Sequence, residues 1–146
     1  MYKKILLPSD GSDYALRAAA AAAELAKALG ASVTVLHVFT MPTTQMAVPG
    51  APGVDVESGA LNAYIEQVQD AVAKRTGRVL DEAGVPYTTL LEGGHPAEVI
   101  VRIAEDDGYD LIVIGSRGLS AIQSFLLGSV SDKVSHHAHC PVLIVK

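Results

Sequence analysis

Glycines cluster in the segment VIGSRGLSAIQSFLLGSVSD, which runs from Val113 to Asp132. Gly115 and Gly118 follow an apolar run, and nine residues then separate Gly118 from Gly128 and Ser129, where a helical pattern begins. Glycine costs backbone entropy, so this cluster indicates an unusual backbone shape or the close approach of another group. Backbone amides without side chains can surround an anion, and a helix N-terminus adds unpaired N–H groups. The spacing favours a phosphate-binding loop.

A purely structural interpretation of these residues stays open. Gly115 and Gly118 could simply turn the chain, and Ser129 with Asp132 fits an S-x-x-D capping box. The two interpretations are compatible, because a cap leaves other first-turn amides free for a phosphate. Asp10 likewise fits ordinary turn chemistry in PSDGSD, and Arg117 could be a phosphate ligand or an exposed surface residue.

Other nucleotide and catalytic motifs are not found. The chain has no G-x-x-x-x-G-K-[S/T] loop, its first turn is not G-x-G-x-x-G, and G-x-S-x-G is absent. A phospho-acceptor receiver domain would need an acidic pair where Asp10 stands alone, and His95 before Pro96 fits a turn better than a catalytic base. We therefore predict no catalytic residue.

Histidines and the single cysteine gather near the end of the chain. His136, His137, His139 and Cys140 are types that bind zinc, but no second ligand cluster completes a site. Histidines near a helix C-terminus also suit the helix dipole. We predict no protein-built metal site.

Composition limits the class of protein. The 146 residues carry a net charge of -5, with 49% apolar and 18% charged residues, which predicts one folded domain over residues 1–146. The sequence has no run of Lys and Arg of the kind that binds nucleic acid. No segment is long and apolar enough for a signal peptide or a membrane span. A lone cysteine fits a reducing compartment, so we expect a cytoplasmic protein.

Strand-like and helix-like patterns alternate along the chain. The predicted strands are Lys3 to Leu7, Ser32 to Val38, Pro86 to Glu92, Asp110 to Gly115 and Pro141 to Lys146. The predicted helices are Ser12 to Leu29, Ala60 to Ala83, Pro96 to Asp106 and Ser129 to His139, with Ser12 and Ser129 as N-caps and Gly30 and Gly84 near C-caps. Nearly continuous apolar runs indicate strands covered on both faces. The pattern predicts an α/β fold with an open, doubly wound, five-stranded parallel sheet.

One connection is long. From Thr40 to Gly59 the chain contains three prolines and three glycines, so neither a helix nor a central strand is expected there. Loops of this length are either functional lids and interaction loops or disordered insertions. The sequence leaves both possibilities open.

The glycine motif Gly115-Ser116-Arg117-Gly118, nine residues, Gly128-Ser129 resembles the ATP-binding signature of the universal stress protein family. An N-terminal strand that ends in Pro8-Ser9-Asp10, a GGHPAEVI segment, DLIVIGSRG and the ending LLGSVSDKVSHHAHCPVLIVK follow the family's order. The resemblance implies a Rossmann-like, adenine nucleotide alpha hydrolase-like sheet with strand order 3-2-1-4-5. Strands one and four would then be neighbours at the point where the strand order reverses. In open α/β sheets, ligands bind at the carboxyl ends of the strands at this switch point.

The resemblance also implies a site for ATP and Mg²⁺. Pro8, Ser9 and Asp10 would lie against the adenosine, with Asp10 near the ribose hydroxyls or the metal. Val38 would contact adenine. Ile114 and Gly115, at the end of the fourth predicted strand, would lie beside the sugar. The phosphates would be bound at Ser116, Arg117, Gly118, Gly128, Ser129 and Val130. Mg²⁺ would be bridged mainly by phosphate oxygens.

The final apolar run should be an edge strand, which tends to recruit another strand. Antiparallel pairing of two copies through Val142 to Lys146 would give a homodimer, which is also usual in the family the chain resembles. The resulting hypothesis is an ATP-binding regulatory protein that acts in stress responses through its dimer, a mobile loop and an unknown protein partner. The alternatives are a slow Mg-dependent ATPase or phosphotransferase, and a nucleotide-free interaction module.

Overall fold

The computed structural model describes residues 1–40, 59–118 and 127–146. Helices and strands alternate as predicted, and each element lies within two residues of its expected range. The elements are β1 (Lys4–Pro8), α1 (Asp13–Leu29), β2 (Ser32–Phe39), α2 (Gly59–Glu82), β3 (Tyr87–Gly93), α3 (Pro96–Asp106), β4 (Leu111–Gly115), α4 (Ser129–His137) and β5 (Val142–Val145). Most of the long connection, residues 41–58, and residues 119–126 of the glycine-rich segment lie outside the described residues.

The strands form a five-stranded parallel sheet in the order β3-β2-β1-β4-β5. The central strand β1 pairs Ile5 with Val33 of β2 on one side and with Leu111 of β4 on the other. The predicted fold class and strand order are therefore confirmed. Because the chain turns in opposite directions from β1 and β4, the carboxyl ends of these neighbours form the switch point at which open α/β sheets bind ligands.

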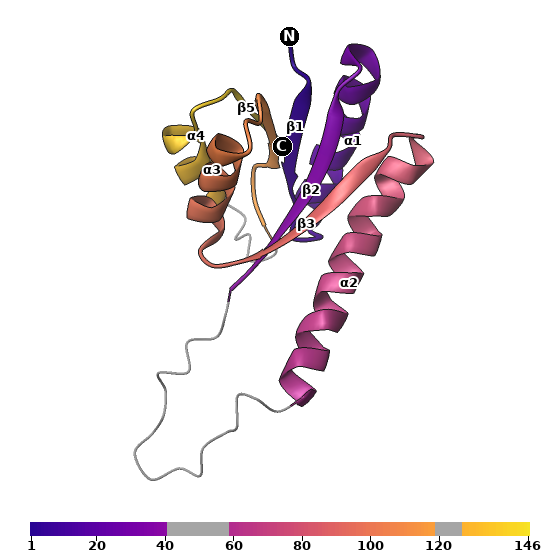
Figure 1. Ribbon diagram of the computed structural model, residues 1–146, viewed down its shortest axis with the longest axis vertical. Helices are drawn as coiled ribbons and strands as arrows, with labels where there is room; N and C mark the ends of the chain where they lie inside the picture. The colour runs from indigo at the N-terminus through magenta and orange to yellow at the C-terminus, as the bar shows by residue number, and fades with distance from the viewer. Residues whose placement is uncertain (41–58, 119–126) are drawn as a thin grey trace.

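Helices cover both faces of the sheet. Side chains alternate along each strand, so Ile5 and Leu7 enter a core beneath α1 and α2, while Leu6 enters a second core beneath α3 and α4. Figure 1 shows the two helix pairs on opposite sides of the sheet. Burial on both faces explains why most of the strands read as continuous apolar runs.

The alanine-rich segment of α1 lies directly on the sheet. Its buried positions recur with helical spacing, at Ala15, Ala18, Ala19, Ala22, Ala23 and Ala26. Such small side chains allow a close approach: a Cβ added to Gly115 of β4 would lie only 2.8 Å from the carbonyl carbon of Tyr14. Gly115 is therefore required by the packing of α1 against β4.

Helix ends follow the sequence in part. Ser12 caps α1 by accepting a hydrogen bond from the Ala15 amide at 3.2 Å, and Gly30 and Gly84 take positive φ values of 65° and 71° just after their helices. The predicted cap at Ser129 is wrong. Gly128 is the N-cap and Ser129 the first helical residue, without a side-chain cap bond.

The last helix is also shorter than predicted. It ends at His137, because Ala138 is extended, with φ -66° and ψ 142°. His139 therefore lies beyond the helix and does not share a helical face with His136. The residue before a proline avoids helical geometry, so Pro141 limits how far the helix could have continued.

Candidate functional site

The turn between β1 and α1 is held by its own polar groups. Pro8 ends β1 and is buried, and Asp10 follows two residues later, half-buried. Asp10 Oδ1 accepts a hydrogen bond from the Ser12 amide at 2.9 Å, and Gly11 between them has a φ of +77°. The carboxylate orientation of Asp10 is thus tied to the backbone conformation of Gly11 and Ser12.

Ser9 points into the protein. Its Oγ lies 2.7 Å from Oγ1 of Thr76 on α2 and accepts the Gly11 amide at 3.2 Å, and its side chain is buried. The ring nitrogen Nδ1 of His37 lies 2.9 Å from the Ser9 carbonyl oxygen. A predicted nucleotide contact by Ser9 would therefore involve its backbone, because its hydroxyl is already bonded to α2.

Three of the predicted adenosine contacts share one face of the sheet. Val38 and Ile114 both belong to the core beneath α3 and α4, at the carboxyl ends of β2 and β4. Pro8, two residues after Leu6 of that core, lies on the same face by strand alternation. The strand order β2-β1-β4 places these side chains along one edge.

Asp10 and Gly118 meet across the switch point. A Cβ added at Gly118 would lie 2.6 Å from Asp10 Oδ2, so the glycine leaves space that the carboxylate borders. The turn after β1 and the loop after β4 therefore converge at one place, as the strand order predicted. The glycine at this position admits groups near Asp10 that a larger side chain would exclude.

The glycine-rich loop is closed at its base. The Gly128 amide donates to the Ser116 carbonyl at 2.7 Å, and Ser131 Oγ donates to the same oxygen at 2.9 Å. An added Cβ at Gly128 would lie 3.1 Å from that oxygen and 3.2 Å from Arg117 Cα. Contact between two backbone segments explains Gly128, so its immediate role is to close the loop.

The first turn of α4 offers backbone donors at this place. The amides of Ser129, Val130 and Ser131 have no carbonyl partner within the helix, as in any helical first turn, and the N-cap residue Gly128 supplies no side-chain cap bond. Ser129 is exposed and Val130 half-buried. These donors and the helix dipole favour an anion near the residues where Gly128 closes the loop.

Two arginines approach one tyrosine beside the loop. The guanidinium carbons of Arg17 and Arg117 lie 5.2 and 5.8 Å from the ring centroid of Tyr14. The face of an aromatic ring attracts cations at such distances. Arg117 is half-buried, so it is a positioned positive charge rather than a fully solvated one.

The sequence of the whole chain, residues 1–146, matches the model of the Universal stress protein family. The universal stress protein MJ0531 of Methanocaldococcus jannaschii is 38% identical over 146 residues, which cover 100% of this chain and 83% of that protein. This chain belongs to the universal stress protein family.

Solved structures of similar proteins share the fold, and complexes with a nucleotide are among them. Protein MJ0577 of Methanocaldococcus jannaschii has a TM-score of 0.81 at 32% identity, covering 100% of this chain and 96% of that one. A universal stress protein in complex with cAMP has a TM-score of 0.71 at 28% identity, covering 99% and 97%. The Archaeoglobus fulgidus family member in complex with dAMP has a TM-score of 0.69 at 25% identity, covering 99% and 98%.

Several residues of this universal stress protein reach the site without having been predicted. Arg75 and Thr76 of α2 contact the turn after β1, and Tyr14 lies beside Arg117. Thr76 could have been found from the sequence, because it lies between the apolar residues Val72 and Leu80 on the buried side of the helix. A buried hydroxyl at that position needs a hydrogen-bond partner. Nothing in the sequence pattern singled out Arg75 or Tyr14.

The histidines near the C-terminus have other partners. His136 Nδ1 lies 2.8 Å from the Asp132 carbonyl, and His139 Nδ1 lies 3.4 Å from Glu105 Oε2. Among residues 1–40, 59–118 and 127–146, no group of three or more His, Cys, Asp or Glu side chains could hold a metal ion. Within the same residues, no helix combines the length and apolar character needed to cross a membrane.

Cys140 lies beside this histidine region and is partly buried. Burial raises the pKa of its thiol above the ordinary value, and the nearby negative charge of Asp110 adds to the increase. The thiol is therefore favoured over the thiolate, which makes Cys140 a poor nucleophile.

Proposed function

We propose that this family member binds ATP at the carboxyl ends of β1 and β4 and acts as a nucleotide-dependent regulatory protein of the cytoplasm. The observation that carries the proposal is the convergence of Asp10 with Gly118 at the switch point, beside the uncapped first turn of α4. Relatives of the same fold have been solved with cAMP and with dAMP, which supports an adenine nucleotide as the ligand.

Each part of the site has a role in this proposal. The apolar edge of Pro8, Val38 and Ile114 would receive the adenosine, and Asp10 would accept hydrogen bonds from ribose hydroxyls. The amides around Gly118 and the first turn of α4 would bind the phosphates, with charge from Arg117. Gly115 would border the sugar while it also allows α1 to pack.

The donor set fits Mg²⁺ that arrives with the nucleotide. The described residues contain no cluster of carboxylates that could hold the ion alone, while Asp10 supplies one carboxylate at the switch point. Mg²⁺ commonly keeps several waters and takes substrate phosphates with one or two carboxylates as ligands. When bound, the ion would neutralise phosphate charge, and Asp10 would be the protein residue nearest to it.

Regulation rather than rapid hydrolysis is the activity that we propose. ATP hydrolysis needs a group that orients the attacking water and stabilisation of the charge at the transferring phosphate. In this proposal Asp10 binds the ribose hydroxyls and Arg117 contributes charge at the phosphates, and no further residue of the described chain is assigned to orient a water. Occupancy of the site would instead change which surface the protein presents, through different nucleotide affinities of two conformations.

We further propose a homodimer through Val142 to Lys146. Strand β5 is at one edge of the sheet, and Leu143 on it is 39% exposed. An apolar edge strand presents unpaired backbone groups to another chain. Antiparallel pairing of two copies would satisfy both strands at once.

The experiment that tests the function begins with what the purified protein carries. The protein is denatured, and released small molecules are identified by mass spectrometry. ATP or another adenine nucleotide is the expected finding. The stripped protein is then incubated with Mg-ATP: intact ATP after many hours supports a regulator, steady release of phosphate supports the slow ATPase, and no binding supports the nucleotide-free interaction module.

A further inference from the structure

Helix α2 contacts the turn after β1 through one of its faces. Val72, Arg75 and Thr76 are spaced three and four residues apart, so they lie on the same side of the helix. Val72 packs against Gly11, where an added Cβ would lie 3.3 Å from its Cγ2. Thr76 is fully buried and bonds Ser9 between the hydroxyl oxygens at 2.7 Å.

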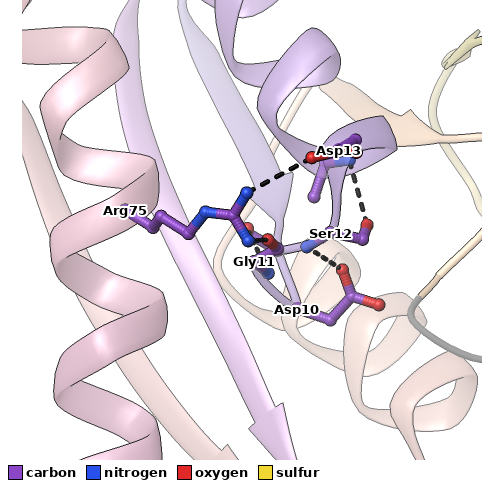
Figure 2. A network of polar contacts seen from close by, with 7 residues as sticks. Asp10, Gly11, Ser12, Asp13 and Arg75 are labelled. Carbon is purple, nitrogen blue, oxygen red and sulfur yellow. Dashed lines mark hydrogen bonds and ion pairs between the residues drawn. The ribbon is translucent and has the colours of Figure 1, made fainter.

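Arg75 makes two polar contacts near this turn with one guanidinium group. Its Nη1 donates to the Gly11 carbonyl at 2.8 Å, and its Nη2 lies 3.2 Å from Asp13 Oδ1. Figure 2 shows Arg75 reaching from α2 to Gly11 and Asp13, while the carboxylate of Asp10 points away from it. The planar fork of arginine suits two acceptors held at a fixed separation.

The contacts of Arg75 determine the orientation of Asp10 indirectly. One peptide group joins Gly11 to Ser12. Its carbonyl oxygen accepts the hydrogen bond from Arg75, and its N–H donates to Asp10 Oδ1. Gly11 has a positive φ of 77°, a conformation that glycine can leave easily because it has no side chain. A fixed carbonyl on one side of this peptide therefore fixes the amide on the other side.

We propose that Arg75 is a positioning residue for the nucleotide site, an inference that rests on the function proposed above. Arg75 holds the Gly11–Ser12 peptide, the peptide amide holds the Asp10 carboxylate, and that carboxylate borders the space at Gly118. Arg75 itself does not touch the nucleotide.

A structural role alone would leave a different signature. The side chain of Arg75 is 55% exposed and that of Asp13 is 78% exposed, and ion pairs of this exposure contribute little to stability. Loss of Arg75 should therefore lower nucleotide affinity while the melting temperature changes little. The helix itself remains anchored by Thr76 and Val72.

The test compares Arg75→Met with Arg78→Met, a matched control that removes the same charge from an exposed position one turn further along α2. ATP affinity is measured by calorimetry for the wild type, both variants, Asp10→Ala and the Asp10→Ala, Arg75→Met double variant. We expect Arg75→Met to weaken ATP binding about tenfold, as for the loss of one charge-assisted hydrogen bond. We expect Arg78→Met to stay within about twofold of the wild type.

The double variant separates positioning from direct action. If Arg75 acts through Asp10, adding Arg75→Met to Asp10→Ala should cost less than about twofold, because coupled residues are not additive. Arg75→Lys should recover part of the affinity, since lysine can reach one of the two acceptors. Unchanged affinity in Arg75→Met, or a full tenfold loss in the Asp10→Ala background, would overturn the proposal.

Hydrogen exchange of the nucleotide-free protein distinguishes this proposal from the function on which it rests. The Ser12 amide should exchange about tenfold faster in Arg75→Met, because this variant frees the Gly11–Ser12 peptide from the arginine. In Arg78→Met its exchange rate should equal that of the wild type. Wild-type protein that binds no adenine nucleotide would overturn the proposed function. Unaltered Ser12 exchange in Arg75→Met would overturn the positioning role, whatever the wild type binds.

Discussion

At the scale of single residues, the glycines of the loop have different reasons to be there. Gly115 faces the backbone of Tyr14, Gly128 faces the backbone of Ser116 and Arg117, and Gly118 faces the carboxylate end of Asp10. Two of the three are thus explained by packing, and Gly118 alone borders a flexible side chain at the switch point. The sequence motif could not make this distinction, because spacing does not show which atoms a missing Cβ would meet.

These different surroundings predict different effects of a valine at Gly118 and at Gly128. Gly118→Val should fold normally, because only the end of the Asp10 side chain must move, but it should weaken ATP binding at least tenfold by filling the space beside that carboxylate. Gly128→Val should lower the free energy of unfolding by about 1–3 kcal/mol, because its side chain would press on backbone. Denaturant unfolding and calorimetry on both variants measure these effects. Normal affinity in a folded Gly118→Val protein would contradict the site.

Asp10 is the residue whose removal should affect binding without affecting the fold. Asp10→Ala removes an acceptor of the Ser12 amide and the ribose contact that we propose, so ATP affinity should fall by about 1.5–3 kcal/mol. Asp107→Ala is a suitable control, since Asp107 is an exposed acidic residue after α3, outside this turn. Equal affinities of Asp10→Ala and the wild type, measured by calorimetry, would remove Asp10 from the site.

Cys140 allows a prediction of pH dependence. Its folded-state pKa is raised, so the neutral thiol is the form that folding favours. The thiol should therefore react slowly with iodoacetamide near neutral pH, and the rate should rise with pH only above the range of an ordinary cysteine. The neutral Cys140 thiol also contributes to the free energy of unfolding. This contribution is present below the unfolded-state pKa and is lost as pH rises through the folded-state pKa. Folded protein that reacts as fast as denatured protein would contradict this.

At the scale of elements, the sequence was sufficient for the order of helices and strands and insufficient for some of their ends. Continuous apolar runs and glycines such as Gly30 are local signals, and both were confirmed. The start of α4 depends instead on a tertiary contact, the Gly128 amide on the Ser116 carbonyl, which makes Gly128 rather than Ser129 the cap. The contacts of Arg75 and Thr76 with the turn likewise join residues more than sixty positions apart, and periodicity carries no such information.

The close packing of α1 predicts an asymmetric response to larger side chains. Ala22→Leu, at a fully buried position, should lower the free energy of unfolding by about 1–3 kcal/mol, because the larger side chain would have to enter a core that its neighbours already fill. Ala20→Leu, at an exposed position of the same helix, should be close to neutral. Urea unfolding of the two variants compares them directly. Equal stabilities would contradict the close packing of α1 on the sheet.

At the scale of the whole molecule, the two edges of the sheet provide a test of the proposed homodimer. Leu143 on β5 and Leu91 on β3 are similarly exposed, at 39% and 44%, but only β5 is proposed to pair with a second copy. Leu143→Glu should convert the dimer to a monomer in light scattering after size-exclusion chromatography, because like charges would meet across the paired strands. Leu91→Glu should leave the dimer intact. A wild-type monomer, or dissociation by Leu91→Glu alone, would contradict the β5 interface.

We propose that Mg-ATP binds where Asp10, Gly118 and the first turn of α4 converge. The most direct measurement is calorimetric titration of nucleotide-stripped wild-type protein with Mg-ATP, beside the folded Gly118→Val variant. We predict saturable binding to the wild type, with one nucleotide per chain, and at least tenfold weaker binding to the variant. Wild-type protein that shows no binding at millimolar Mg-ATP, or binding that Gly118→Val leaves unchanged, would contradict it.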